Sequence, residues 1–336
     1  MASQRIQGLR QHLESLLRRD FAARGAKSVD EIALGRRVDE YYLPMFLWTE
    51  EVVQAARKRS ADQRCVFIGL SCPQGGGKTT VSKYLEEMMG FTGKSCAVLS
   101  LDDVYWTRAK QLEVAAANPG NPLLQYRGNP GTQDLSFLND FIRECKTSNE
   151  EILVPRYDKS MHSGRGDRAP KSEWVPKQGP LDVVIIEGWC IGFQALEPTS
   201  PLLSEDMKPV NAALHEYEEF YQELDGMVVI KIGDLDWVYK WREEPEQLLR
   251  DAGKPAMTQA ELRDFIDRYM PAYKLYIPAL YEDPGKVAAL PDRRLWSPSS
   301  SVASVPRLVM AIDRQRQPAA QPVEFNFAST AVASLE

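Results

Sequence analysis

The segment GLSCPQGGGKTT, residues 69–80, constrains the fold of this chain more than any other stretch of its sequence. Its second half matches the pattern G-x-x-x-x-G-K-[ST], in which a glycine-rich turn opens a helix and wraps an anion. Counting back from Gly77, Lys78 and Thr79 puts the first glycine of that pattern at Cys72. The segment is therefore either a phosphate-binding loop with a substituted first position or a glycine-rich turn that resembles one.

The residues on either side of this segment favour a phosphate-binding loop. CVFIGL, residues 65–70, is a short apolar run typical of a buried strand, and TVSKYLEEMMGF, residues 80–91, is typical of a helix. A strand, a glycine turn and a helix in succession are the context that the pattern requires. The glycines before Lys78 would let backbone N–H groups converge on a phosphate at the helix N-terminus. The first glycine mainly eases a turn, so a small residue such as Cys72 could replace it.

Four more apolar runs of strand length follow along the chain, and helical stretches separate them. Short strands without polar positions are typical of a parallel sheet that helices cover on both faces. We therefore predict an α/β fold with a parallel sheet of the type found in P-loop NTPases. The four runs are CAVLSL (96–101), DVVIIEGW (182–189), MVVIKI (227–232) and RLVMAI (307–312).

The chain divides into three predicted regions. Residues 1–60 are expected to form a helical extension, because apolar residues recur there at helical spacing. Residues 61–317 would form the domain that carries the glycine loop, and residues 318–336 would form a loosely ordered tail. Within the domain, residues 283–304 contain several prolines and a serine run, so they are expected to form a surface loop before the last strand.

The composition excludes several classes of protein. A net charge of −6 over 336 residues lacks the basic excess that a nucleic-acid-binding face needs. No apolar run approaches the roughly 20 residues of a membrane span, and the charged start of the chain does not resemble a signal peptide. The five cysteines are scattered, which is typical of a reduced compartment rather than of a disulfide scaffold or a zinc site. We therefore expect a cytoplasmic protein that binds neither nucleic acid nor membrane.

Acidic residues follow two of the predicted strands, at the edge where ligands bind to open α/β sheets. LDDVY places Asp102 and Asp103 at the end of the second strand, and VVIIEG places Glu187 at the end of the third. A carboxylate in the position of Glu187 can hold Mg²⁺ directly or through water, and the Thr79 hydroxyl is a further candidate ligand. The alternatives are a helix-capping turn for the two aspartates and a purely solvated Glu187.

The order of these motifs resembles the P-loop small-molecule kinases, the group of phosphoribulokinase, uridine kinase and pantothenate kinase. Within that group the chain is similar to the D-glycerate 3-kinases of plants, algae and fungi. In this family the loop resembles A/C-P-Q-G-x-G-K-T, so Cys72 is a family variant of the loop. The similarity extends over about residues 69–281, and the segments that carry it are SCPQGGGKTT, SLDDVYWT, NPGNPLLQYRGNPGTQDL, VPRYDKSMHSGRGDRA, IIEGWCIGF, YKWREEPEQ and RYMPAYKLYIPALY.

The resemblance implies ATP and Mg²⁺ as cofactors and direct in-line transfer of a phosphoryl group to D-glycerate, giving 3-phosphoglycerate. Asp102 matches the family aspartate that orients or deprotonates the acceptor hydroxyl, and Asp103 would support it on the substrate or metal side. Lys78 would contact the transferred phosphate. The implied ATP-binding residues are Pro73, Gln74, Gly75, Gly76, Gly77, Lys78, Thr79 and Thr80, and the implied Mg²⁺ ligands are Thr79, Asp102 and Glu187.

Glycerate is a small anion with one carboxylate and two hydroxyl groups. Its carboxylate suits a planar bidentate donor, which is an arginine. Asp134 and Tyr157 could form hydrogen bonds with the hydroxyl groups, whereas His162 is expected to lie in a surface loop. The candidate arginines for the carboxylate are Arg127, Arg156, Arg165 and Arg168.

Residues 233–275 correspond to the lid of these kinases. Arg242, and with it Arg250, would close over the phosphates and stabilise the charge that develops during transfer. The alternative is that both arginines lie on a solvated helix face. The adenine pocket would lie near the last strand, around residues 312–318, and Lys274 is a further candidate near the substrate.

Two other functions remain open from the sequence. The chain could be another kinase of the same group, acting on a nucleoside, pantothenate or a sugar phosphate, or a regulatory protein that binds ATP without turnover. The density of arginines between residues 127 and 168 suits a small anion better than a nucleoside. Plant relatives act in chloroplasts, so the stroma is an alternative compartment if a transit peptide has been removed. Cys72 is either a reactive thiol with a lowered pKa beside Lys78 or a buried, inert one.

Overall fold

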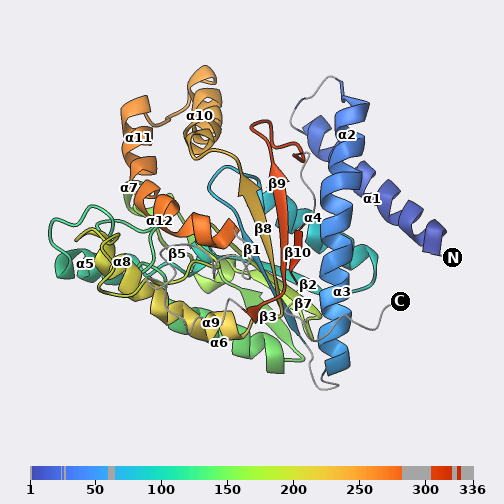
Figure 1. Ribbon diagram of the computed structural model, residues 1–336, viewed down its shortest axis with the longest axis horizontal. Coiled ribbons are helices and arrows are strands. Elements are labelled where there is room, and N and C mark those ends of the chain that lie inside the picture. The colour runs from blue at the N-terminus through green and yellow to red at the C-terminus, as the bar shows by residue number, and fades with distance from the viewer. Residues whose placement is uncertain are drawn as a thin grey trace.

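The computed structural model describes residues 2–23, 25, 28–59, 65–281, 304–319 and 324–326. At its centre lies a six-stranded sheet in the order β10-β9-β8-β1-β7-β2 (Figure 1). All neighbouring strands from β9 to β2 are parallel, and β10 pairs antiparallel to β9 at one edge. The strands of this sheet are β1 (Val66–Ser71), β2 (Cys96–Ser100), β7 (Val183–Gly188), β8 (Gly226–Ile232), β9 (Arg307–Ile312) and β10 (Glu324–Asn326).

The five apolar runs are confirmed as the five parallel strands, with ends that differ from the expected ones by at most one residue. The register of the sheet is what brings the candidate site together. Leu70, next to the glycine loop, pairs with Glu187 of β7, and Glu187 pairs on its other side with Ser100 of β2. The loop, the acidic end of β7 and the aspartates after β2 therefore leave the sheet at one level of its carboxyl edge.

Helices cover both faces of the sheet, as expected (Figure 1). On one face α3 approaches so closely that a Cβ on Gly226 would lie 2.9 Å from Trp48 and 3.0 Å from Val52. The α-helices are α1 (Ala2–Ala23), α2 (Glu31–Arg37), α3 (Leu43–Arg59), α4 (Lys78–Phe91), α5 (Arg108–Ala117), α6 (Leu135–Thr147), α7 (Met161–Gly164), α8 (Met207–Ala213), α9 (Tyr217–Gln222), α10 (Asp236–Asp251), α11 (Gln259–Asp267) and α12 (Met270–Tyr281). Shorter helical turns are the π-helix η1 (Val38–Tyr42) and the 3₁₀ turns η2 (Leu101–Val104), η3 (Lys171–Glu173) and η4 (Leu214–Glu216).

The helical character expected for residues 1–60 is confirmed by α1, α2, η1 and α3, and α3 packs on β1 and β8. A buried carboxylate fixes this segment to the domain. Glu50 is 3% exposed and accepts hydrogen bonds from Arg5 and from Lys94, the latter at 2.7 Å. Because an unpaired buried carboxylate is costly, this triad holds α1, α3 and the start of β2 in one arrangement.

Several features differ from the expectations or fall outside them. The tail expected from residue 318 includes β10, which pairs with β9. No apolar run predicted this strand. The loop expected at 283–304 lies outside the described residues apart from its last one. Two small antiparallel pairs that we did not predict are β3 (Glu151–Val154) with β6 (Val175–Gln178) and β4 (Tyr157–Asp158) with β5 (Asp167–Arg168).

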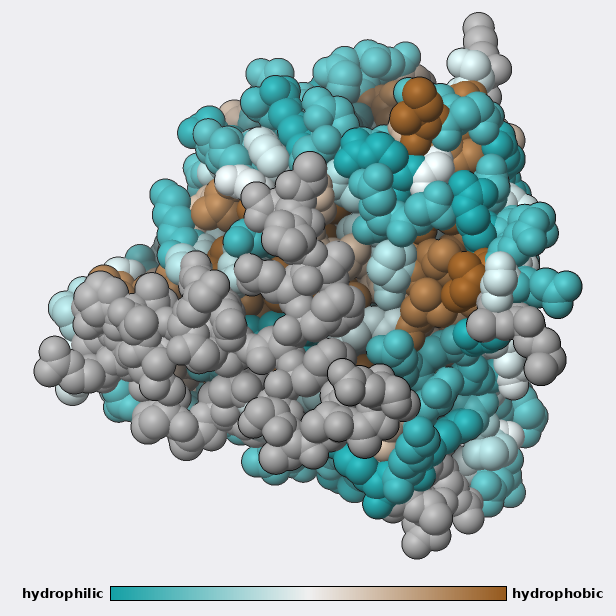
Figure 2. Space-filling view, turned by 45° about the vertical axis from the view of Figure 1, so that its right-hand side comes forward, coloured by the Kyte–Doolittle hydropathy of each residue, from teal (hydrophilic) through white to brown (hydrophobic). Residues whose placement is uncertain are grey.

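Where described residues are visible in Figure 2, hydrophilic ones predominate, and hydrophobic ones form small separate groups between them. No helix within the described ranges has the length and apolar character needed to cross a membrane.

Candidate active site

The glycine loop links β1 to α4 in the conformation that a phosphate-binding loop needs. Gly77 is the N-cap of α4 with a φ of 98°, and Gly75 has a φ of 82°. Both lie in the left-handed region, where a Cβ is disfavoured, so glycine is required at these two positions. Lys78 begins the helix, and its Nζ donates to the carbonyl oxygens of Cys72 at 2.9 Å and Pro73 at 3.4 Å. The lysine therefore lies folded over the loop, with its charge at the helix N-terminus.

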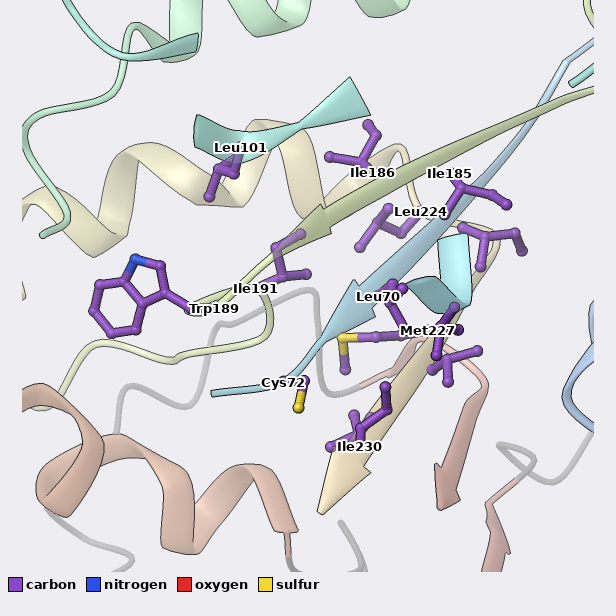
Figure 3. Packing of buried hydrophobic residues seen from close by; sticks show 14 of the residues in the cluster. Leu70, Cys72, Leu101, Ile185, Ile186, Trp189, Ile191, Leu224, Met227 and Ile230 are labelled. Carbon is purple, nitrogen blue, oxygen red and sulfur yellow. The ribbon is translucent and has the colours of Figure 1, made fainter. Parts of the chain in front are cut away.

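Cys72 occupies the first position of the loop as a buried side chain. It follows the end of β1 and belongs to the hydrophobic cluster that also contains Leu70 and Ile230 (Figure 3). A Cβ built on Gly76 would lie 2.3 Å from the Cys72 Sγ, so the sulfur fills the space beside that glycine. Burial raises the pKa of the thiol to about 12, although Lys78 opposes the shift. Of the two alternatives for Cys72, the structure supports the buried, inert thiol.

Three side chains from distant segments support the loop, and sequence reasoning did not identify them. The Tyr273 hydroxyl on α12 accepts a hydrogen bond from the Gln74 N–H at 3.0 Å. Arg316 Nε donates to the Gly75 carbonyl at 2.7 Å, and the Trp241 ring on α10 lies against Gly75. The aromatic density of RYMPAYKLYIPALY was the available signal for Tyr273, but it indicated packing and no particular contact.

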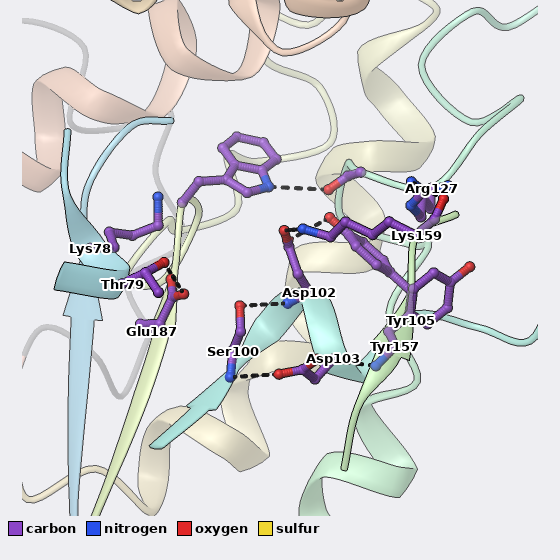
Figure 4. Close-up of polar contacts among 12 residues, drawn as sticks. Lys78, Thr79, Ser100, Asp102, Asp103, Tyr105, Arg127, Tyr157, Lys159 and Glu187 are labelled. Carbon is purple, nitrogen blue, oxygen red and sulfur yellow. Dashed lines mark hydrogen bonds and ion pairs between the residues drawn. The ribbon is translucent and has the colours of Figure 1, made fainter. Parts of the chain in front are cut away.

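Thr79 and Glu187 meet at the start of α4. The Thr79 hydroxyl donates to Glu187 Oε1 at 3.4 Å, and Glu187 is 6% exposed (Figure 4). Burial raises the pKa of Glu187, and the charge of Lys78 opposes the shift. The solvated alternative for Glu187 is therefore wrong. A hydroxyl beside a buried carboxylate is a set of hard oxygen donors that fits Mg²⁺, which takes few ligands from protein and the rest from phosphates and water.

Asp102 is held from two sides in the turn after β2. The Tyr105 hydroxyl donates to its Oδ1 at 2.8 Å, and Lys159 Nζ contacts its Oδ2 at 2.5 Å (Figure 4). Burial alone would raise the pKa of Asp102, but Lys159 and Tyr105 bring it below its ordinary value. Asp102 is therefore an ionised carboxylate of fixed orientation. We did not single out Lys159 from the sequence, although it belongs to the RYDKS segment.

Asp103 performs the capping role that we had kept as an alternative for both aspartates. It accepts from the Ser100 N–H at 3.4 Å as half of a capping box. It also accepts from the Tyr157 N–H at 3.1 Å and lies 3.4 Å from an Arg156 guanidinium nitrogen. Asp103 thus ties the strand that carries Tyr157 and Arg156 to the turn that carries Asp102.

The remaining candidate arginines differ in their partners. Arg168 donates to Asp134 Oδ2 at 2.8 Å and lies 4.0 Å over the Phe137 ring, so this pair is already occupied. Asp134 also caps α6 by accepting from the Phe137 N–H at 3.0 Å. Arg127 donates to the carbonyl oxygens of Gly164 and Arg165 and shapes the loop that carries Arg165.

Arg165 is the exposed candidate, and its loop is strained. His162 and Ser163 before it adopt φ values of 52° and 57°, which non-glycine residues rarely do. His162 contacts Asp167 at 3.1 Å and is exposed, as expected for a surface loop. No ion pair of Arg165 occurs among the described residues, and its guanidinium lies 4.0 Å over the Tyr126 ring.

The predicted lid region contains α10 and α11, which stand beyond the carboxyl edge of the sheet in Figure 1. Arg250 donates to the Met257 carbonyl at 2.6 Å and contacts Glu243, so it attaches the end of α10 to the segment that leads into α11. Arg242 differs, because within the described chain its buried Nε has no hydrogen-bond partner. Its guanidinium lies 5.6 Å over the Phe265 ring of α11. Lys274 is exposed on α12.

Comparisons with known proteins give consistent results. No protein-family model matches the chain. It is 41% identical over 268 residues to the chloroplastic D-glycerate 3-kinase of Arabidopsis thaliana, a match that covers 77% of this chain and spans 58% of that protein. It is 37% identical to an uncharacterized kinase of Schizosaccharomyces pombe, covering 65% of this chain and 83% of that protein. D-glycerate 3-kinase from Cryptococcus neoformans var. grubii has a similar structure, with a TM-score of 0.67, 29% identity, and coverage of 84% of this chain and 99% of that one.

Proposed function

This chain belongs to the family of P-loop kinases that includes the D-glycerate 3-kinases, and from that premise we propose that it phosphorylates D-glycerate with ATP. The observation that carries the proposal is the meeting of three segments at the carboxyl edge of the sheet. The glycine loop with Lys78 and Thr79 lies beside Glu187, and Asp102 lies in the turn after the adjacent strand. An anion-binding loop, a buried carboxylate and an oriented aspartate are the parts that phosphoryl transfer needs.

In this proposal the glycine loop holds the phosphates of ATP. Its N–H groups and Lys78 would bind phosphate oxygens, and Lys78 would exchange its contacts with the Cys72 and Pro73 carbonyls for them. Thr79 and Glu187, together with Asp102, would hold Mg²⁺. The bound ion would neutralise charge on the phosphates. Glu187 is buried and the charge of Lys78 acts on its carboxylate, so this carboxylate would lie near the phosphates that Lys78 binds.

Asp102 would address the acceptor hydroxyl. Its two oxygens are fixed by Tyr105 and Lys159, so an incoming hydroxyl would take the place of one of these donors. Since the pKa of Asp102 lies below its ordinary value, we infer that the residue orients the hydroxyl and accepts its proton only as transfer proceeds. Transfer is then direct and in line, without a phosphoenzyme.

The acceptor carboxylate would bind to Arg165. Arg156 and Arg168 already face Asp103 and Asp134, whereas Arg165 has no carboxylate partner in the described part of the chain. Arg127 would hold the loop that presents Arg165, and Tyr157 would line the site next to Tyr105, with 5.5 Å between the ring centres. With the family's position of attack, the product would be 3-phosphoglycerate.

The test is an ATP-turnover assay with D-glycerate against a panel of L-glycerate, uridine, pantothenate and ribulose 5-phosphate, with Lys78→Ala as the control. We expect turnover with D-glycerate that Lys78→Ala abolishes, and ³¹P NMR of the product should show the phosphate on O3. Faster turnover with another acceptor would assign the chain to a different kinase of the group. ATP binding that Lys78→Ala abolishes, without turnover on any acceptor, would identify a regulatory protein.

We propose the cytoplasm as the compartment, with the chloroplast stroma as the alternative. The name of the Arabidopsis relative places that protein in the chloroplast. Fractionation of cells that express the tagged full-length protein distinguishes the two locations.

A further inference from the structure

Arginine and aromatic side chains alternate along a line that joins α10 to the loop before β5. Arg242 lies 5.6 Å over the Phe265 ring, and Arg268 lies 5.5 Å over the same ring. Arg268 also lies 4.9 Å over the Tyr126 ring, and Arg165 lies 4.0 Å over that ring. All four distances fall within the range of cation–π contacts. We call Arg242, Phe265, Arg268, Tyr126 and Arg165 the arginine ladder.

The ladder connects the two arginines that, in the proposed function, would contact the two different substrates. Arg242 belongs to the proposed lid and would contact phosphates, whereas Arg165 would contact the acceptor carboxylate. Arg268 lies between them and begins the RYMPAYKLYIPALY segment, although the sequence assigns it no role. It is the one ladder arginine that contacts both rings.

Little negative charge compensates the ladder. Arg268 lies 3.6 Å from Asp264, whose side chain is 79% exposed and therefore well screened. Within the described ranges neither Arg242 nor Arg165 forms an ion pair, and Arg242 Nε is buried without a hydrogen-bond partner. Three guanidinium groups in a row repel one another, so an anion at either end makes the arrangement more favourable.

Hydrogen bonds to the backbone hold Arg268, the middle arginine of the ladder, in place. Asn129 donates from its side-chain amide to the Arg268 carbonyl at 3.0 Å and to the Leu123 carbonyl at 3.1 Å. The end of α11 is thereby attached to the segment that carries Tyr126. Arg268 is therefore held to this segment both by the Tyr126 ring and by the Asn129 amide.

We propose that Arg268 is a positioning residue that couples acceptor binding to the placement of Arg242 over the nucleotide. An acceptor carboxylate on Arg165 would remove repulsion along the ladder and favour the arrangement in which Arg242 meets phosphate. This inference rests on the proposed function. By linkage, bound nucleotide then strengthens acceptor binding by the same factor.

The experiment measures this coupling factor directly. Isothermal titration calorimetry gives the affinity for Mg²⁺ and the imido analogue of ATP, with and without saturating D-glycerate, in the full chain. The variants are Arg268→Ala, Tyr126→Leu and Tyr126→Phe. Arg263→Ala is the matched control, because Arg263 lies on α11, which ends next to Arg268, and 5.3 Å over the Tyr239 ring but outside the ladder.

We expect D-glycerate to tighten analogue binding about fivefold or more in the wild type, in Arg263→Ala and in Tyr126→Phe, which keeps the ring. Arg268→Ala and Tyr126→Leu should bring that factor close to one, while each ligand alone still binds. A purely structural Arg268 would change the separate affinities and leave the factor intact, which would overturn the inference. A wild-type factor of one in an enzyme that turns over D-glycerate would overturn the inference alone. Absence of glycerate binding and turnover would instead reject the proposed function on which it rests.

Discussion

The sulfur of Cys72 occupies the space that any side chain at Gly76 would need, since a Cβ there would lie 2.3 Å from it. The usual pattern places a glycine at the first position of the loop and leaves the fifth position free. Here the first position carries a side chain and the fifth carries none. The side chain at Cys72 therefore fits in the loop because Gly76 has none.

Gly76→Ala should destabilise the protein, and removal of the Cys72 sulfur should reverse the effect. The φ of Gly76 does not lie in the left-handed region, so the added methyl group would not strain the backbone. It would instead clash with the Cys72 sulfur. Overpacking of this kind costs about 1–3 kcal/mol of unfolding free energy. Denaturant unfolding of Gly76→Ala, Cys72→Ala and the double variant measures the coupling between the two positions.

Gly77→Ala is the control for that pair. A Cβ on Gly77 meets no atom within 4 Å, but its φ of 98° strains any other residue. Cys72→Ala should therefore leave the defect of Gly77→Ala unchanged. If it relieved both glycine variants equally, the effect of Cys72 would not come from contact with Gly76.

The Cys72 thiol should resist alkylation in the folded protein. A pKa raised to about 12 leaves the thiol protonated at pH 8, with roughly one molecule in ten thousand as thiolate. Mass spectrometry after iodoacetamide treatment at pH 8 should find Cys72 modified only after denaturation. Rapid and complete modification of Cys72 while the circular dichroism spectrum stays native would show that its thiol is reactive.

Asp102→Asn should lower kcat by about 10²–10⁴-fold, which is far more than it weakens ATP binding. The amide still accepts a hydrogen bond from Tyr105 but cannot take up the hydroxyl proton, and it loses the ion pair with Lys159. Steady-state kinetics together with calorimetric titration of ATP separate the two effects. An effect on ATP affinity alone would contradict the role assigned to Asp102.

Arg165→Gln and Arg168→Gln should behave differently although both remove one charge from positions only three residues apart. Arg165 has no carboxylate partner within the described residues, so its variant should raise the KM for D-glycerate about tenfold or more at unchanged stability. Arg168→Gln also breaks the contact with Asp134, whose side chain is 14% exposed, and should lower the unfolding free energy by about 1–3 kcal/mol. Kinetics and thermal unfolding of both proteins test this difference. Equal losses of stability would mean that Arg165 has a structural role too.

Local sequence patterns were sufficient for the parallel sheet and the glycine loop. An apolar run such as VVIIEG predicts a strand that is buried on both faces of a sheet. The glycines of the loop predict a turn, because they adopt positive φ values that other residues do not adopt easily. The conformation of residues 75–79 and the acidic end of β7 could therefore be predicted from the residues themselves. β10 could not, because it has only three residues and pairs by backbone hydrogen bonds at an edge of the sheet.

The sequence alone determined which residues could do chemistry, since it placed Lys78, Asp102 and Glu187 after successive strands of one fold. Only the tertiary structure decided their partners. Lys159 is 57 residues from Asp102 along the chain yet contacts it, and Arg168 donates to Asp134, which lies 34 residues before it. Such contacts depend on how loops of different origin pack together, and no local propensity encodes that packing. The same holds for the loop itself, because glycine spacing identified it, while the structure shows that Cys72 is buried and has no positive φ, so a residue with a Cβ fits there.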